Sequence, residues 1–119
     1  MTNKQKSYYY GMAKRGRLIN LYTNDKNIGL ITFFIGNGNV NKYVRENPWS
    51  IVDDEPIKGD TCYIDQLLTS KEKINRYASL RVWADIKKYM RDNFKNVKCI
   101  RWNRFKHDWG KPKTFKEGL

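Results

Sequence analysis

Four short segments of the chain have the hydrophobic pattern of β-strands. Residues 17–22 and 28–35 are apolar segments on either side of a cluster at 23–27, whose Asn and Asp residues tolerate turn geometry. These two segments predict an antiparallel hairpin. Residues 62–67 and 97–102 alternate between the two faces of a strand, as half-buried strands do.

Between the last two predicted strands, apolar residues recur every three or four positions, which is the period of an α-helix. The stripe consists of Leu80, Trp83, Ile86, Met90 and Phe94. We expect this helix over residues 75–93. Its start is marked by the capping-box arrangement from Thr69 to Glu72, with Asn75 as a second candidate cap.

Shorter helices are expected within residues 1–15, where Gly11 or Gly16 would end one, and at residues 40–46. The predicted order is helix, strand, strand, irregular segment, strand, helix, strand and tail. A strand-helix-strand unit of this length implies a parallel pair with a right-handed crossover. Attached to the hairpin, this unit predicts an α/β fold with a mixed sheet.

The composition is that of a small and strongly basic domain. We expect 119 residues to form a single domain, because the chain is long enough for one core and too short for two. The 24 Lys and Arg residues outnumber the 12 Asp and Glu residues, which gives a net charge of +12. This charge predicts attraction to nucleic acid, to an acidic protein or to phosphorylated cofactors, and it does not choose among them.

Neither a membrane span nor a secretory signal is visible. No run of apolar residues approaches the roughly 20 that a membrane-spanning helix needs. The N-terminus lacks the apolar segment of a signal peptide. We therefore expect an intracellular, cytoplasmic protein.

Several candidate motifs have simple structural explanations. Cys62 and Cys99 lie in separate strands and the chain has a single histidine, so we expect two reduced, buried thiols and no metal site. The glycines at 36–39 lack the spacing of a phosphate-binding loop, so they predict a turn. The acidic triplet at 53–55 predicts a solvated loop.

Asp65 is the candidate residue of greatest chemical interest. In an alternating strand it shares a face with Tyr63 and Leu67 rather than with polar neighbours. A carboxylate in such a place is either hydrogen-bonded for structural reasons or tuned for chemistry. In the structural alternative it pairs with Arg76 or Arg101 and stabilises the sheet.

The order of elements resembles the core of the GNAT acyltransferase superfamily. The segments NIGLITFFIG, GDTCYIDQLLTSKE and VKCIRWNR resemble one branch of it, the RTX toxin-activating lysine acyltransferases. In that branch a Gly-Asp pair precedes an aromatic strand with an Asp and then a turn. Gly59 and Asp60 match the pair, residues 63–65 match the strand and residues 68–70 occupy the turn. The resemblance extends over residues 17–118.

The resemblance implies an acyltransferase-like domain that moves an acyl group from a thioester donor to a protein lysine or another amine. It implies acyl-CoA or an acyl-carrier-protein thioester as the donor, and an acidic acyl carrier or protein substrate as the partner. Asp65 would be catalytic, by deprotonating or orienting the amine. The residues that would hold the donor, through backbone amides and phosphate-binding cations, are Leu68, Thr69, Ser70, Lys71, Lys73 and Arg76.

Two positions depart from the family pattern. The branch has a catalytic histidine before the hairpin, where this chain offers Ser7 and the tyrosines at 8–10. The single histidine, His107, lies in the tail and is expected to face solvent. In residues 73–78 the superfamily's glycine position is occupied by Arg76.

A domain this small could also complete its sheet by pairing with a second copy.

The basic and aromatic segments at both ends support competing hypotheses. In the tail, cations alternate with rings, as a site for single-stranded nucleic acid requires. The candidate contacts are Arg101, Arg104, Lys106, Trp109, Lys111 and Lys113. Rings in a terminal strand are also commonly buried against the sheet. A third hypothesis is a catalytically inactive GNAT-like fold, encoded by a phage or mobile element, that inhibits an acidic protein.

Overall fold

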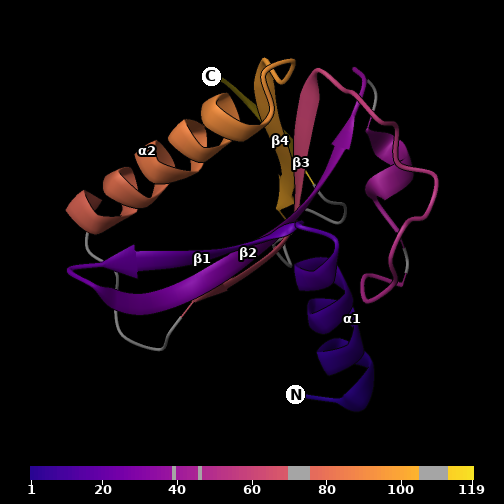
Figure 1. Cartoon of the computed structure of the whole chain (residues 1–119), viewed down its shortest axis with the longest axis horizontal. Helices are drawn as coiled ribbons and strands as arrows, with labels where there is room; N and C mark the ends of the chain where they lie inside the picture. Colours follow the sequence, from indigo (N-terminus) through magenta and orange to yellow (C-terminus); the bar gives the residue numbers. More distant parts are fainter. Residues whose placement is uncertain (39, 46, 70–75, 105–112) are drawn as a thin grey trace.

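The chain forms one mixed β-sheet with a helix on each face (Figure 1). The computed structural model describes residues 1–38, 40–45, 47–69, 76–104 and 113–119. The elements are α1 (Asn3–Lys14), β1 (Leu18–Thr23), β2 (Lys26–Gly36), the 3₁₀-helix η1 (Asn41–Tyr43), β3 (Thr61–Thr69), α2 (Arg76–Asn93), β4 (Cys99–Arg104) and β5 (Lys113–Gly118). None of the helices in these ranges is long and apolar enough to cross a membrane.

The strands lie in the sheet in sequence order, from β1 to β5. β3 and β4 run parallel, with α2 between them in the chain, and the other neighbouring pairs are antiparallel. The predicted α/β fold, with its hairpin and its crossover, is confirmed. The prediction misses β5, because its sequence KTFKEG holds three charged residues and lacks apolar alternation.

The hairpin turn is tighter than the five residues predicted. Thr23 pairs with Lys26, so Asn24 and Asp25 alone form the loop. Their φ angles are +50° and +64°, as in a type I′ turn, whose twist matches that of the strands it joins. Asn and Asp tolerate this left-handed conformation better than other residues with a Cβ atom. The rest of the predicted turn therefore lengthens the two strands.

One face of the sheet is covered by α2, and the core on this side joins four strands to the helix. It includes Ile31, Phe33, Cys62, Ile64, Ile86, Met90 and Ile100. Trp83 and Phe94 pack against it, so most of the predicted apolar stripe is confirmed. Leu80 is the exception, with 62% of its surface exposed. Among the described side chains of α2, those that join the core begin only at Val82.

The opposite face is covered by α1 and by the segment that follows β2. This second core consists of Tyr8, Met12, Phe34, Val40, Tyr43 and Tyr63. The predicted helix at 40–46 is wrong in length, because only the single turn η1 forms. Val40, just before η1, and Tyr43, its last residue, belong to this core.

Both ends of α1 are fixed by local hydrogen bonds. Thr2 caps the first turn in a reciprocal capping box with Gln5. Of the two candidate terminators, Gly16 ends the helix, with φ of +72°. Its amide and that of Arg17 donate to carbonyls of the last turn at 3.1 and 2.8 Å, which is the Schellman arrangement.

The Gly-Asp pair at the start of β3 has a structural role. A side chain at Gly59 would collide with the backbone of Gly36. The Asp60 carboxylate accepts hydrogen bonds from the Gly38 amide at 2.9 Å and the Thr61 hydroxyl at 2.8 Å. These bonds lower the pKa of Asp60. The pair therefore joins the turn after β2 to the first residue of β3.

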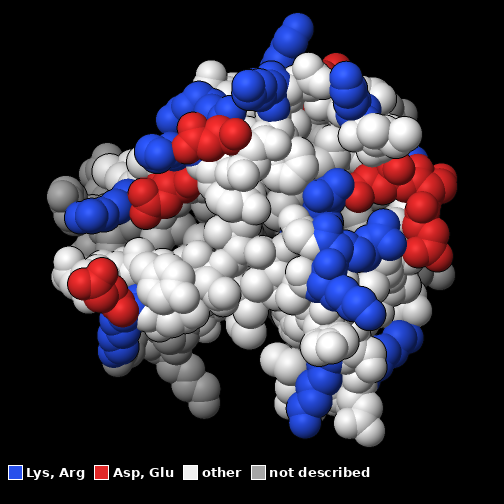
Figure 2. Space-filling view, in the orientation of Figure 1, with Lys and Arg blue, Asp and Glu red and all other residues white. Residues whose placement is uncertain are grey.

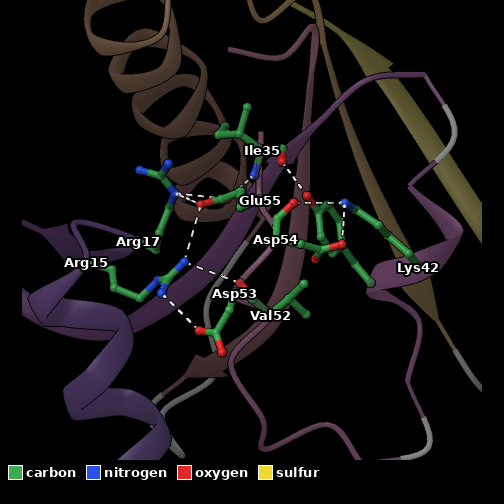
Figure 3. Close-up of polar contacts among 9 residues, drawn as sticks. Arg15, Arg17, Ile35, Lys42, Val52, Asp53, Asp54 and Glu55 are labelled. Carbon is green, nitrogen blue, oxygen red and sulfur yellow. Dashed lines mark hydrogen bonds and ion pairs between the residues drawn. The ribbon is translucent and has the colours of Figure 1, made fainter. Parts of the chain in front are cut away.

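Glu55 and Tyr43 close an edge of β2 that β1 leaves open. Figure 3 shows Glu55 beside Ile35. β1 is paired with β2 only as far as Thr32. Beyond that point, the Ile35 amide donates to Glu55 Oε2 at 2.6 Å, and the Tyr43 hydroxyl donates to the Ile35 carbonyl at 2.5 Å. Because an unpaired backbone group in the interior is costly, these two side chains take the place of a neighbouring strand.

The Glu55 side chain is only 6% exposed, and its charge is balanced by arginine. Arg17 Nε lies 3.1 Å from both carboxylate oxygens, and Arg15 lies 4.0 Å from one. The solvated loop predicted for residues 53–55 is confirmed at Asp53 and Asp54, which are exposed, and is wrong at Glu55. Figure 2 shows acidic side chains beside Lys and Arg at this edge of the molecule.

Burial, together with Glu55 and Asp54, raises the pKa of Tyr43 to about 12.

We expect Glu55→Gln to lower the free energy of unfolding by about 2–3 kcal/mol, because it leaves Arg17 without its partner in a partly buried site. Chemical denaturation measures this change. Asp53→Asn is the matched control, since the Asp53 side chain is 92% exposed, and its effect should stay within about 0.5 kcal/mol. Equal effects of the two substitutions would contradict the role assigned to Glu55.

Candidate functional site

Asp65 lies at a β-bulge in the middle of β3. The pairing of β2 with β3 runs through Thr32 opposite Gln66 and resumes at Phe33 opposite Ile64, so Asp65 is the extra residue. Past the bulge, Leu67 lies opposite Ile31 and therefore on the face that α2 covers. The prediction that Asp65 and Leu67 share a face is wrong, because the bulge interrupts the alternation.

The Asp65 carboxylate is bound by two side chains from other parts of the chain. Its Oδ2 atom accepts hydrogen bonds from the Tyr8 hydroxyl of α1 and, at 3.0 Å, from Arg45 Nη2. The Tyr8 hydroxyl also lies 2.6 Å from Thr32 Oγ1. The side chain of Asp65 is 5% exposed and that of Arg45 is 13% exposed. The structural alternative named Arg76 or Arg101 as the partner of Asp65, and the ion pair that the described residues show is with Arg45.

Arg45 is held by several acceptors at once. Its guanidinium donates to the carbonyls of Tyr43, Pro48 and Ser50 at 2.8, 3.0 and 2.9 Å, and to the Ser50 hydroxyl at 3.2 Å. It lies 5.1 Å from the centre of the Phe34 ring. The charge beside Asp65 is therefore fixed in place, and the same residue fixes the loop after η1.

Burial has the largest effect on the pKa values of the acidic groups in this site, and hydrogen-bond partners and nearby charges come second. Burial raises the pKa of Asp65, and the hydrogen bonds from Tyr8 and Arg45 act in the opposite direction. Burial and the Asp65 charge raise the pKa of Tyr8 well above its usual range, and they raise that of Tyr63 to about 12. At neutral pH Tyr8 is therefore a hydrogen-bond donor. Asp65 is the group in this site that can accept a proton.

A cavity of about 410 Å³ lies where β3 and β4 part. The two strands pair only from Thr61 to Ile64, although β3 continues to Thr69. The lining is mostly apolar and includes Ile64, Leu67, Val82, Trp83 and Trp102, with Asp65 and Thr69 from β3. This volume and this lining are typical of small-molecule sites. Asp65 thus borders the cavity and belongs to the polar network with Tyr8.

Two of the residues predicted to hold a donor lie at the end of β3. Thr69 borders the cavity, and Leu68 is 41% exposed. Arg76 is the first residue of α2. Ser70, Lys71 and Lys73 lie outside the described residues, so their role stays a prediction.

The residues proposed to bind nucleic acid do not form one surface in the described part of the tail. Trp102 packs on Trp83 and Phe115 with ring centres 5.0 and 5.8 Å apart, so these rings face α2. Arg101 pairs with Tyr63 of β3 and lies on the face away from these rings, and Arg104 is the last residue of β4. Lys113 lies opposite Arg104 at the start of β5. Lys106, His107, Trp109 and Lys111 lie outside the described residues.

The arrangement of elements is similar to that in the crystal structure of the loading GNATL domain of CurA from Lyngbya majuscula. The TM-score is 0.62 at 12% sequence identity, over 92% of this chain and 54% of that one. The chain has a GNAT-like fold. A protein named as an acetyltransferase from Staphylococcus aureus Mu50 gives a TM-score of 0.49 at 16% identity, over 83% of this chain and 60% of that one.

The chain therefore spans only 54% and 60% of the lengths of these two proteins. No protein-family model matches the sequence, and no curated protein sequence is similar to it. The GNAT-like core expected from the sequence is confirmed. The resemblance to the RTX toxin-activating branch remains a prediction.

Sequence reasoning identifies Asp65 and misses the residues that surround it. Tyr8 and Met12 are four positions apart and both are buried, so helical spacing was the available signal for Tyr8. Arg45 lies in an irregular segment and carries no such signal. Cys62 and Cys99 are reduced and buried, as predicted. The described residues contain no cluster of three or more metal-ligating side chains.

We expect Tyr8→Phe to lower the free energy of unfolding by about 1–3 kcal/mol, because Asp65 and Thr32 lose a buried hydrogen-bond partner. Tyr10→Phe is the matched control, since Tyr10 lies on the same helix and is 74% exposed. Its effect should stay within about 0.5 kcal/mol. A Tyr8→Phe protein as stable as the control would mean that the hydroxyl does not hold Asp65.

The raised pKa of Asp65 predicts a pH dependence of stability. A carboxyl group whose pKa is higher in the folded state contributes stability that is present at low pH and lost as pH rises through the folded pKa. Chemical denaturation across the acidic range should therefore show wild type losing stability relative to Asp65→Asn as pH increases above the usual aspartate pKa. A loss in the opposite direction would mean that Arg45 and Tyr8 outweigh burial.

Proposed function

We propose that the protein is an acyltransferase that moves an acyl group from a thioester donor to a protein lysine or another amine. One observation carries the proposal: the apolar cavity at the parted strands β3 and β4 is lined in part by Asp65, whose side chain is buried. The GNAT-like fold supports the reaction class. The resemblance to the RTX toxin-activating branch supports lysine as the acceptor and acyl-CoA or an acyl-carrier-protein thioester as the donor.

The parted strands suit a thioester arm for a physical reason. Past Ile64, no described residue of β4 is paired with β3, so backbone amides and carbonyls of β3 are available to a ligand on that side. The apolar walls, including Trp83 and Trp102, can cover the carbon atoms of the arm or of the acyl group. A donor placed here would run along Leu68 and Thr69.

The phosphates of a CoA donor would then lie toward the start of α2. Ser70, Lys71 and Lys73 connect β3 to this helix, and Arg76 is its first residue. A helix N-terminus favours anions, and cations beside it strengthen the binding of phosphate. We assign these residues to the donor on this basis.

Asp65 is the proposed base. The amine nitrogen attacks the thioester carbonyl, the carbon–nitrogen bond forms, and the carbon–sulfur bond breaks. The proton that the amine loses goes to the Asp65 carboxylate and then to the leaving thiolate. The raised pKa makes Asp65 a stronger base than an exposed aspartate. Because its side chain is 5% exposed and its carboxylate contacts the α1 side, we propose that the amine reaches it through the gap where β3 and β4 part.

The family branch that the chain resembles has a catalytic histidine before the hairpin, and in this proposal Tyr8 takes over only part of that role. It comes from the segment before the hairpin and contacts Asp65, but its raised pKa keeps it protonated. Its proposed role is to hold the carboxylate. The proton transfer itself is assigned to Asp65.

The test measures donor binding by calorimetry with acetyl-CoA and a long-chain acyl-CoA, and transfer by thiol release in the presence of a lysine peptide. We expect Leu67→Trp, which narrows the cavity at a residue that is 63% exposed, to weaken donor binding by about tenfold or more. Leu80→Trp is the control, because Leu80 is also exposed and lies outside the cavity lining.

In the same assay, Asp65→Asn should bind the donor as wild type does and transfer about a hundredfold more slowly. Failure of both thioesters to bind wild type would reject the proposed function. Donor binding that Leu67→Trp leaves intact would reject the cavity as the site. Unchanged transfer in Asp65→Asn would remove Asp65 from the chemistry and leave the site in place.

A further inference from the structure

Arg101 and Lys116 lie directly opposite each other on β4 and β5. Tyr63, which pairs with Arg101 from β3, belongs to the core on the α1 side, so both cations lie on the face away from α2. Side chains of directly opposed residues start about 5 Å apart, and like charges at this distance repel. Among the described residues neither cation has an ion pair.

The Arg101 side chain also carries an unused donor. Its Nε atom is buried and has no hydrogen-bond partner in the described part of the chain. Buried polar atoms almost always have a partner, so an exception calls for a physical reason. An acceptor supplied by another molecule is such a reason, and an anion would at the same time relieve the repulsion between Arg101 and Lys116.

The next residue pair on this face adds polar groups. The Thr114 hydroxyl donates to Asn103 Oδ1 at 2.7 Å, so the amide group of Asn103 is oriented and its nitrogen is the donor that remains. Lys116 and Thr114 are exposed, while Arg101 and Asn103 are half-buried. The four side chains form a polar strip with two positive charges.

We propose that this strip, formed by Arg101, Lys116, Asn103 and Thr114, is the docking surface for an acidic segment of a protein partner. A carboxylate of the partner accepts hydrogen bonds from the Arg101 guanidinium, whose planar donors match carboxylate geometry, and Lys116 adds a second charge. The net charge of +12 attracts such a partner over distance. The proposal goes beyond the acyl transfer proposed above and does not rest on it.

The chemistry of the strip favours protein over nucleic acid. Sequence-tolerant binding of single strands needs rings on which bases stack, next to the cations. The described rings of β4 and β5, Trp102 and Phe115, stack on each other on the opposite face of the sheet. The strip therefore offers charge and hydrogen-bond donors without a stacking surface among the described residues.

The test is fluorescence anisotropy of a short labelled peptide of Glu and Ser residues, titrated with the full chain. Arg101→Met and Lys116→Met should each weaken binding by about tenfold, or about 1.4 kcal/mol. Arg81→Met is the control, because it removes the same charge from an exposed position on α2, at the other face of the sheet. It should change the affinity by less than about twofold.

Equal weakening by all three substitutions would overturn the proposal, because binding would then follow net charge alone. Unchanged binding in Arg101→Met and Lys116→Met would overturn it as well. A labelled oligothymidine that binds more tightly than the peptide, and loses affinity in the same two variants, would assign the strip to nucleic acid instead. If Arg101→Met fails to fold, the exposed Lys116 decides the outcome. The peptide contains neither a thioester nor a lysine, so this result is independent of acyl transfer.

Discussion

The bulge at Asp65 is the constraint on which the site depends. One extra residue in β3 turns the following side chains over, so that Leu67 and Thr69 face the cavity while the Asp65 carboxylate faces α1. A buried carboxylate is costly unless it is paired and hydrogen-bonded. Arg45 and Tyr8 supply these bonds and come from two separate segments, so the same requirement positions the loop after η1 and the N-terminal helix. The geometry of the cavity and the docking of α1 are therefore linked through one side chain.

Glu55 is a second buried carboxylate, and it accepts a hydrogen bond from the Ile35 amide of β2. There the exposed edge of a strand is closed by a carboxylate and a phenol, and the carboxylate is neutralised by Arg17. Both buried acids are thus held by an arginine that also lies against a phenylalanine ring, Phe34 for Arg45 and Phe94 for Arg17. Cations used in this way do not contribute to a binding surface. The part of the positive charge available to partners is accordingly that of exposed residues and of Arg101, which has no acid beside it among the described residues.

The sequence predicts the elements whose pattern is local and misses those that tertiary contacts decide. Periodicity finds the hairpin, the central strand and the helix, because each buries one face along its own length. It misses β5, whose charged residues form a strand through pairing with β4, and it places Leu67 on the wrong face because a bulge leaves no mark on hydrophobic alternation. Asp65 could be identified because a carboxylate in an apolar strand is unusual. Arg45 could not, because its partners lie up to 20 residues away and depend on the folded loop.

The sheet separates two surfaces of opposite character. Under α2, the parted strands enclose an apolar cavity, whereas the other face of the sheet carries the half-buried Arg101 on β4 and the exposed Lys116 on β5. Asp65 is positioned between them, since it borders the cavity and its carboxylate contacts the α1 side. A small donor and a large acidic partner could therefore occupy opposite faces of the sheet together, with Asn103 as the residue of the strip that also lines the cavity. Any coupling between the two would pass through β4 itself, by way of Asn103 or by way of Trp102 and its neighbour Arg101, and it would appear as a change in affinity for the acidic peptide when a thioester fills the cavity.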